Sequence, residues 1–245
     1  SNADYIDGGV GNDSILGLAG VDTIYGGDGN DTILGGQGND QMFGGDGSDT
    51  FIWNPGDASD LVEGQGGQNV LIFNGADGVN DSFIMSARGT GAQGTGTRLR
   101  FDRQPGNVVI DAAGIQQVNA NAGSGNDDVT INNLADTEVK VIQVTLGALA
   151  TPFTPDGVRD NITINGRQAS NEMVLTVQPV PNQPAGTTQV DIEGLTQHIF
   201  LGGTVAACPS TPTDDYLTIN GGSGNDHITA DMGVELKVAM LINGG

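Results

Sequence analysis

Basic residues, cysteine and aromatic residues are all scarce in this chain. Only 8 of its 245 residues are Lys or Arg, against 30 Asp or Glu, and the formal net charge is −22. Nucleic acid and anionic membrane surfaces are therefore poor partners, whereas cations are favourable ones. The single cysteine, Cys208, excludes an internal disulfide. No run of about 18 apolar residues is present that would span a bilayer.

Glycine, in contrast, is abundant, and it recurs in a fixed pattern. Five successive nonapeptides fill residues 8–52: GGVGNDSIL, GLAGVDTIY, GGDGNDTIL, GGQGNDQMF and GGDGSDTFI. Each has Gly at positions 1 and 4 and Asp at position 6, and Leu18 alone replaces Gly at position 2. Residues 4–7 match the end of a further repeat and residues 242–245 the start of another. We therefore expect a segment of a longer repetitive protein.

The nonapeptide pattern predicts a parallel β-roll. Glycines allow tight left-handed turns and leave carbonyl groups bare, and the residues after each turn form a short strand with one apolar side chain pointing inward. One nonapeptide is then half a coil, so turns two repeats apart stack on the same edge at about 4.8 Å. The expected inward series is Ile6, Ile15, Ile24, Ile33, Met42 and Phe51.

Stacking at this spacing places carboxylates of successive coils close together on each edge, where they repel unless a cation lies between them. Ca²⁺, which accepts six to eight oxygen ligands in flexible geometry, suits such a gap better than Mg²⁺. We expect three or four ions, between Asp13 and Asp31, Asp22 and Asp40, Asp31 and Asp49, and, as the fourth, Asp4 and Asp22. The predicted metal-site residues are Asp4, Gly8, Gly9, Gly11, Asp13, Gly17, Gly20, Asp22, Gly26, Gly27, Gly29, Asp31, Gly35, Gly36, Gly38, Asp40, Gly44, Gly47, Asp49 and Asp60.

These repeats resemble the hemolysin-type calcium-binding nonapeptides of the RTX family, with the consensus GGxGxDxUx. The resemblance implies Ca²⁺ as the cofactor and a secreted, extracellular location. The segment that follows, 53–60, resembles the way such rolls are closed, so we expect a capped roll over 4–60 in which Trp53 plugs the coil end. Asp57 and Asp60 then either complete a last calcium site or lie on the surface.

Two further sets of repeat positions have expected roles. Asp28 and Asp46, at position 3, are expected to be solvated charges. The position 9 residues point outward although they are apolar, and we expect a neighbouring segment to cover them, with a partner-binding stripe as the alternative. These residues are Leu16, Tyr25, Leu34 and Phe43.

The region 61–245 contains a second, longer repetition. NAGSGNDDVTIN (121–132) matches NGGSGNDHITAD (220–231), and RDNITING (159–166) echoes DDYLTING (214–221). Short strand-like runs separated by Asn-Gly or Gly-rich turns, without helical periodicity, predict an all-β structure. The region resembles the β-strand repeats found among hemolysin-type repeats in large secreted bacterial proteins. That resemblance implies a β-helix-like solenoid, with a β-sandwich as the alternative.

Within such a solenoid, we expect successive rungs to stack the same apolar positions. Asp127 and Asp226, in the two longer copies, are further candidate calcium ligands, although each copy lacks a neighbouring repeat. The expected rung residues are Val129 and Ile131, Ile162 and Ile164, Leu217 and Ile219, and Ile228.

Candidates for catalysis are few. His198 and His227 are the only histidines, and the chain contains no GxSxG, HExxH, paired-cysteine or phosphate-loop motif. Among 30 acidic residues, no pair stands out as an acid and base. We therefore expect the segment not to be an enzyme, with a polysaccharide-acting β-helix enzyme as the less favoured alternative.

Half of the basic residues, Arg88, Arg98, Arg100 and Arg103, flank a glycine-rich stretch at 89–97. We expect these arginines to neutralise neighbouring carboxylates. The alternative is a patch that binds an anionic glycan.

Together these features predict calcium binding coupled to folding. The roll buries little apolar surface, and repulsion among its excess acidic residues opposes compaction. Calcium binding must therefore supply the stabilising free energy that the core does not. The predicted role is a structural or spacer segment of a large secreted RTX-type protein, such as a toxin or adhesin. Its expected partners are calcium ions, and cell-surface glycan or other repeats of the same chain. A glycan-binding adhesion module is the alternative function.

Overall fold

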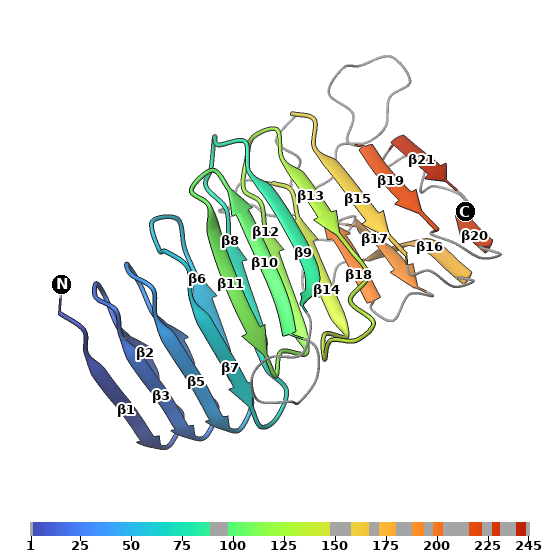
Figure 1. The fold of residues 1–245 in the computed structure, drawn as a ribbon. Helices are drawn as coiled ribbons and strands as arrows, with labels where there is room; N and C mark the ends of the chain where they lie inside the picture. The colour runs from blue at the N-terminus through green and yellow to red at the C-terminus, as the bar shows by residue number, and fades with distance from the viewer. Residues whose placement is uncertain are drawn as a thin grey trace.

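Two long β-sheets face each other and form a flattened solenoid, shown as a computed structural model in Figure 1. The structure describes residues 2–88, 98–147, 158–166, 172–179, 188–193, 198–202, 216–221, 227–230 and 239–243. Every regular element in these residues is a β-strand, and none of them forms a helix that could cross a membrane. The all-β prediction is therefore confirmed.

Within the described residues, the first sheet has 11 strands. In spatial order they are β1 (Tyr5–Val10), β3 (Thr23–Asp28), β5 (Gln41–Asp46), β7 (Leu61–Gln65), β11 (Val108–Ala113), β10 (Arg98–Gln104), β9 (Ser82–Arg88), β13 (Asp128–Ile131), β15 (Asn161–Asn165), β19 (Tyr216–Asn220) and β21 (Ala239–Asn243).

The second sheet has 10 strands in the part of the chain that the structure describes. In spatial order they are β2 (Ser14–Leu16), β4 (Thr32–Leu34), β6 (Thr50–Trp53), β8 (Val70–Asn74), β12 (Gln117–Asn121), β14 (Val141–Thr145), β18 (His198–Gly202), β17 (Thr188–Glu193), β16 (Glu172–Pro179) and β20 (His227–Ala230).

The nonapeptides form the N-terminal coils as predicted, and the strands that follow successive aspartates alternate between the two sheets. Ile6 pairs with Ile24, which pairs with Met42, and Ile15 pairs with Ile33, all in parallel register. Except for Ile6 at the open end, which is half-buried, the predicted inward residues are at most 7% exposed. Alternation within each short strand therefore supplies a single central stack of apolar side chains.

The roll does not end at residue 60, so the expected cap is wrong. Strand β5 pairs in parallel with β7, and β6 with β8, so both sheets continue without a break. Trp53 is 2% exposed and stacks on Phe73 in the next coil, with ring centroids 4.2 Å apart. It is an interior rung residue and not a plug. The division of the chain into domains at 4–60 and 61–245 stays a prediction.

The second region is a solenoid with two antiparallel interruptions. Parallel pairs join β8, β12 and β14 in one sheet and β9, β13, β15 and β19 in the other. Antiparallel pairs occur in β9, β10 and β11 and again in β16, β17 and β18. Among the described strands, antiparallel pairing of the kind expected for the β-sandwich alternative is thus limited to these two inserts.

The expected rungs of this region are largely confirmed. Val129, Ile162 and Leu217 lie in one parallel register, and their three strands are neighbours in the first sheet. Ile131, Ile164 and Ile219 form the adjacent row. Ile228 differs, because β20 belongs to the second sheet and pairs with β16.

Candidate metal sites

Two ladders of hydrogen bonds run along the edges of the solenoid, where the turns of successive coils stack. On the first edge, the main-chain N–H of Asp4 donates to Oδ1 of Asp22 (2.8 Å), that of Asp22 to Asp40 (2.8 Å), and that of Asp40 to Asp60 (2.9 Å). Each aspartate therefore uses one carboxylate oxygen to bind the coil before it. Asp60, for which a metal site and a surface position were both open, belongs to this ladder.

The second edge repeats the arrangement. The N–H of Asp13 donates to Oδ1 of Asp31 (2.8 Å), that of Asp31 to Asp49 (2.9 Å), and that of Asp49 to Oδ1 of Asn69 (2.7 Å). The predicted neighbours on both edges are therefore correct. Sequence reasoning missed the last pair on each edge, because the coil grows from 18 to 20 residues at these steps.

The second oxygen of these aspartates is buried without a hydrogen-bond partner. This holds for Oδ2 of Asp13, Asp22, Asp31, Asp40 and Asp49. Leaving a buried carboxylate oxygen unpaired is costly, and native proteins satisfy nearly all such atoms. Five repetitions at one turn position indicate a missing cationic or donor partner common to all of them.

At four of the five turns, the space over the position 1 glycine borders both the unpaired carboxylate oxygen and a carbonyl oxygen of the next coil. A Cβ at Gly17 would lie 2.8 Å from Oδ2 of Asp22 and 2.5 Å from the carbonyl oxygen of Gly35 in the next coil. A Cβ at Gly26 would likewise collide with Oδ2 of Asp31 and with the Gly44 carbonyl. Two oxygens from adjacent coils thus approach the same small space, which only glycine leaves open.

The glycines at positions 2 and 4 shape the turns. Most have positive φ, and a Cβ on those in the second and later coils would strike a carbonyl oxygen of the preceding coil. Leu18 adopts a φ of 74° at position 2, which a non-glycine residue rarely does. The positive-φ glycines of the repeats are Gly9, Gly11, Gly27, Gly29, Gly36, Gly38, Gly45 and Gly47. Of these, Gly45 was absent from the predicted set.

This donor set suits calcium. In the part of the chain that the structure describes, no group of three or more His, Cys, Asp or Glu side chains converges, so a metal ion at these turns would need main-chain carbonyl ligands as well. A carboxylate oxygen surrounded by carbonyl oxygens is an all-oxygen site, which hard cations prefer, and Ca²⁺ tolerates its irregular geometry. The residues therefore fit the ion that the repeats imply, at five positions where three or four ions were expected.

Burial also changes the acidity of these side chains. It raises the pKa of Asp40 and Asp49, with smaller contributions from the neighbouring carboxylates Asp22 and Asp31. It raises the pKa of Asp60 to about 8. Burial likewise raises the pKa of Asp57, whose charge adds to the repulsion at Asp40 and Asp60. Without a metal ion, this end of the first edge favours bound protons.

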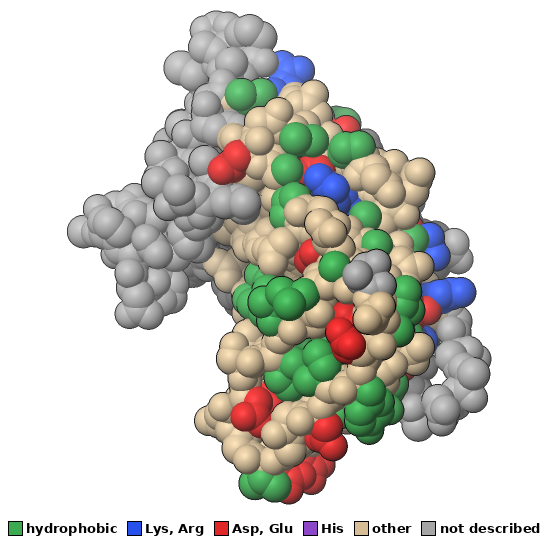
Figure 2. Space-filling model, turned by 90° about the vertical axis from the view of Figure 1, so that its left-hand side faces the viewer, with side chains coloured by type: hydrophobic (Ala, Val, Ile, Leu, Met, Phe, Trp, Pro, Cys, Tyr) green, Lys and Arg blue, Asp and Glu red, His purple; other side chains and the backbone are tan. Residues whose placement is uncertain are grey.

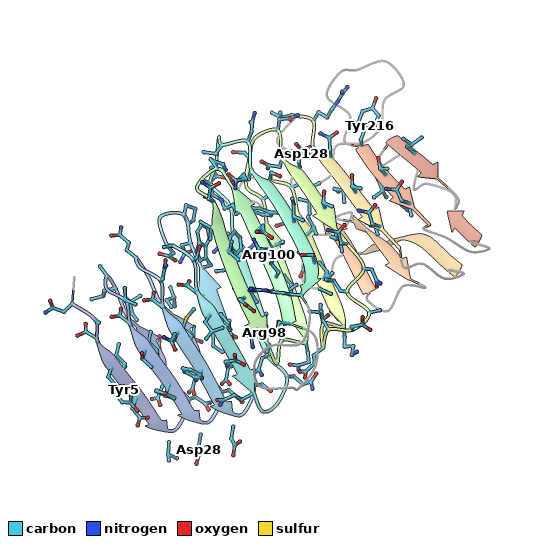
Figure 3. The ribbon with its side chains drawn as sticks, viewed as in Figure 1. Tyr5, Asp28, Arg98, Arg100, Asp128 and Tyr216 are labelled. Carbon is cyan, nitrogen blue, oxygen red and sulfur yellow. The ribbon has the colours of Figure 1, made fainter. Side chains whose placement is uncertain are left out.

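The outward repeat positions behave partly as expected. Asp28 and Asp46 are exposed, and Figure 3 shows Asp28 at the lower edge of the ribbon. Tyr25 and Phe43 are half-buried because their rings stack on each other with centroids 4.7 Å apart. Leu16 is 53% exposed, so no segment covers it and that expectation is wrong there.

The N-terminal end of the solenoid combines apolar and acidic surface. Figure 2 shows hydrophobic side chains beside acidic ones at this end. Its exposed large hydrophobic residues are Tyr5, Val10, Leu16, Leu18 and Val21.

The arginine cluster neutralises carboxylates, as expected. Arg88 pairs with Asp111 (2.5 Å), and Arg98 with Glu63 (2.6 Å) and also with Asp111. Figure 3 shows Arg98 and Arg100 beside the middle strands of the first sheet. Arg100 pairs with Asp102 at 2.5 Å.

The fourth arginine, Arg103, points inward and pairs with Asp81 at 2.7 Å. Because all four guanidinium groups have acidic partners, their charge favours ion pairing within the chain over an anionic-glycan patch. The glycine-rich stretch 89–97 lies outside the described residues.

The ladder resumes in the second region. The N–H of Asp81 donates to Oδ1 of Asp127 (2.7 Å), and that of Asp127 to Oδ1 of Asp160 (2.7 Å). Gly123 and Gly125 have positive φ, like the glycines of the nonapeptides. Calcium binding at Asp127 stays a prediction.

Several other candidates lie outside the described residues. Asp226 and Cys208 are among them, as are the side chains of His198 and His227, whose main chains begin β18 and β20. Their expected roles stay predictions.

Comparison with known proteins supports the reading of the repeats. The family model of the RTX calcium-binding nonapeptide repeat (4 copies) matches residues 1–33, 16–51 and 218–234. No curated protein and no solved structure matches the chain. The first two matches include the turns that carry Asp13, Asp22, Asp31, Asp40 and Asp49. The third match begins within β19. Over these residues the chain carries RTX calcium-binding nonapeptide repeats, and with its all-β fold it is similar to RTX or hemolysin-type repeat proteins.

Proposed function

We propose that calcium ions bind between successive turns on both edges and that their binding is coupled to folding of the solenoid. Each ion would be held by one of five aspartates together with main-chain carbonyl oxygens of two adjacent coils. The ligands would be Oδ2 of Asp13, Asp22, Asp31, Asp40 and Asp49. The carrying observation is that these five buried oxygens have no hydrogen-bond partner.

Coupling of calcium binding to folding is energetically favoured over binding to a preformed rigid site. A buried unsatisfied polar atom costs roughly 1–3 kcal/mol, and folded domains are stable by only about 5–15 kcal/mol. Five such oxygens on two edges would therefore cancel much of the free energy of unfolding of a metal-free roll. A bound cation would cross-link adjacent coils and neutralise the carboxylates, so binding energy becomes folding energy.

We also propose that the segment is a structural part of a large secreted RTX-type protein and performs no catalysis itself. Extracellular calcium modules bind with dissociation constants of about 10⁻⁴ to 10⁻³ M. Such a roll would stay loose at low cytosolic calcium and become ordered outside the cell. Hydrolysis of a polysaccharide by the purified segment would contradict this role.

The test compares the protein in EGTA, in millimolar Ca²⁺ and in millimolar Mg²⁺. We expect calcium to increase the β-sheet circular dichroism and to raise the melting temperature, and magnesium to do so much less. A free calcium concentration tenfold above Kd contributes about 1.4 kcal/mol per site. Equal melting temperatures and spectra in all three buffers would refute calcium-coupled folding.

A further inference from the structure

The turn after Asp49 on the second edge has the geometry of a calcium turn but carries an amide. Asn69 lies at the aspartate position, and its Oδ1 accepts the N–H of Asp49 at 2.7 Å, just as Oδ1 of Asp49 accepts that of Asp31. Gln65 and Gly67 adopt positive φ (61° and 73°) at the positions of the repeat glycines. The turn is therefore equivalent in structure, although its sequence, GQGGQN, departs from the nonapeptide pattern.

The other amide atom of Asn69 shows what the unpaired aspartate oxygens face. Nδ2 donates to the carbonyl oxygen of Gly66 (2.8 Å) in its own turn and to that of Gly114 (2.9 Å) in the next coil. A Cβ at Gly64 would lie 2.6 Å from this Nδ2, as a Cβ at Gly17 would meet Oδ2 of Asp22. Nδ2 therefore occupies the place that Oδ2 takes in the aspartate turns.

The two side chains differ in one chemical respect. A carboxylate oxygen cannot donate, so in an aspartate turn it faces carbonyl oxygens without attraction unless a cation joins them. The asparagine NH₂ group has two hydrogens and binds both carbonyl groups directly. We infer that Asn69 is a built-in replacement for calcium, which ends the metal array on this edge after Asp49 and keeps the next coil closed without an ion.

The first edge continues with a different replacement. The next aspartate along this edge, Asp81, lies beyond the antiparallel insert. It accepts the N–H of Ala76 through Oδ2 (2.9 Å), and its Oδ1 lies 2.7 Å from the guanidinium of Arg103. Arg103 is 7% exposed and lies 5.3 Å from the centre of the Trp53 ring. Here the chain supplies the positive charge itself, from the antiparallel insert. On the second edge the last metal-dependent coil thus adjoins a coil that carries its own donors, and on the first edge such a coil follows beyond the antiparallel insert.

This inference rests on the proposed calcium binding, and the experiment separates the two. Isothermal titration measures calcium stoichiometry for the wild-type chain, for Asn69→Asp and for Gln68→Asp, which adds the same charge at the exposed neighbouring residue. Asn69→Asp should bind one more ion than the wild type. It should also melt at a lower temperature in EGTA and recover in calcium, whereas Gln68→Asp should keep the wild-type stoichiometry.

The converse variant keeps the test decisive if Asn69→Asp does not fold. Asp31→Asn should bind one ion fewer than the wild type and melt at the same or a higher temperature in EGTA, because its amide can bind the carbonyl oxygens directly. Lower EGTA stability of Asp31→Asn, or wild-type stoichiometry in a folded Asn69→Asp, would overturn the inference alone. A wild-type chain that binds no calcium would overturn the proposed function as well.

Discussion

The main-chain N–H of Asp13 donates a hydrogen bond of 2.8 Å to Oδ1 of Asp31, one coil further along the solenoid. The same relationship recurs along both edges, so each aspartate has two separate tasks. One oxygen holds the preceding coil through its main chain. The other is buried without a hydrogen-bond partner and is the proposed cation ligand, so loss of the side chain should affect both the fold and metal binding.

Asp31→Ala should remove the acceptor for Asp13 and one carboxylate ligand. We expect the calcium stoichiometry to fall by at least one ion and the free energy of unfolding in calcium to fall by about 2–3 kcal/mol. Urea unfolding and isothermal titration measure these quantities. Asp28→Ala is the matched control, because Asp28 is exposed, and it should change stability by less than about 0.5 kcal/mol. Equal effects of the two variants would contradict the assigned role of Asp31.

The metal-free protein should lose stability as the pH rises from about 4 to about 8. Burial raises the pKa of Asp60 to about 8 from an ordinary value of 3.8, and it raises the pKa of Asp40 and Asp57 in the same direction. The folded state then binds more protons than the unfolded state across this window, so deprotonation favours unfolding.

Melting temperatures of the calcium-free protein across this window measure that effect. Asp60→Asn should flatten the dependence, because it removes the carboxyl group whose pKa burial raises to about 8. Metal-free stability that increases between pH 5 and pH 8 would show that these carboxylates are not protonated in the folded protein.

Leu18→Gly should stabilise the roll. Leu18 has a φ of 74° and is 64% exposed, so glycine relieves backbone strain while little packing is lost. We expect a gain of about 1 kcal/mol in the free energy of unfolding, measured in calcium by urea titration. Val21→Gly is the control, since Val21 is exposed in the same turn without a positive φ. It should destabilise, and a similar gain there would contradict the explanation by strain.

Trp53→Ala should destabilise the solenoid strongly. The Trp53 ring stacks on Phe73 at 4.2 Å, and its indole N–H donates to the carbonyl oxygen of Ala58 at 2.8 Å. Removing a buried aromatic side chain costs about 3–5 kcal/mol, which urea unfolding would detect. Tyr5→Ala, at a side chain 71% exposed, should cost far less. A loss at Trp53 below about 1 kcal/mol would contradict its interior position.

Features with a purely local cause could be predicted from the sequence. Glycine at positions 1, 2 and 4 predicts positive φ angles or close contact between the main chains of adjacent coils. Asp at position 6 predicts an oxygen ligand. Ile24 and Phe51 were correctly placed inside, because alternation in a short strand sets which face they occupy. The ion pairs of Arg98 and Arg100 also follow from an acidic chain with few cations.

The features that were missed depend on which coils become neighbours. Asp49 and Asn69 are 20 residues apart, so a strict nonapeptide register does not align them. Asp81 and Arg103 meet only because β10 inserts antiparallel between β11 and β9. Trp53 suggested a cap in the sequence, yet the coil formed by β7 and β8 covers it.

The sequence by itself determined the repeating unit, the inward residues and the calcium chemistry of this protein, because each depends on residues within one turn or strand. Only the tertiary structure decided where the metal array stops. An amide at Asn69 and a guanidinium at Arg103 become replacements for a cation only when stacking brings Gly114 or Asp81 within hydrogen-bonding distance. Such contacts join residues far apart in the chain, so a short sequence pattern does not predict them.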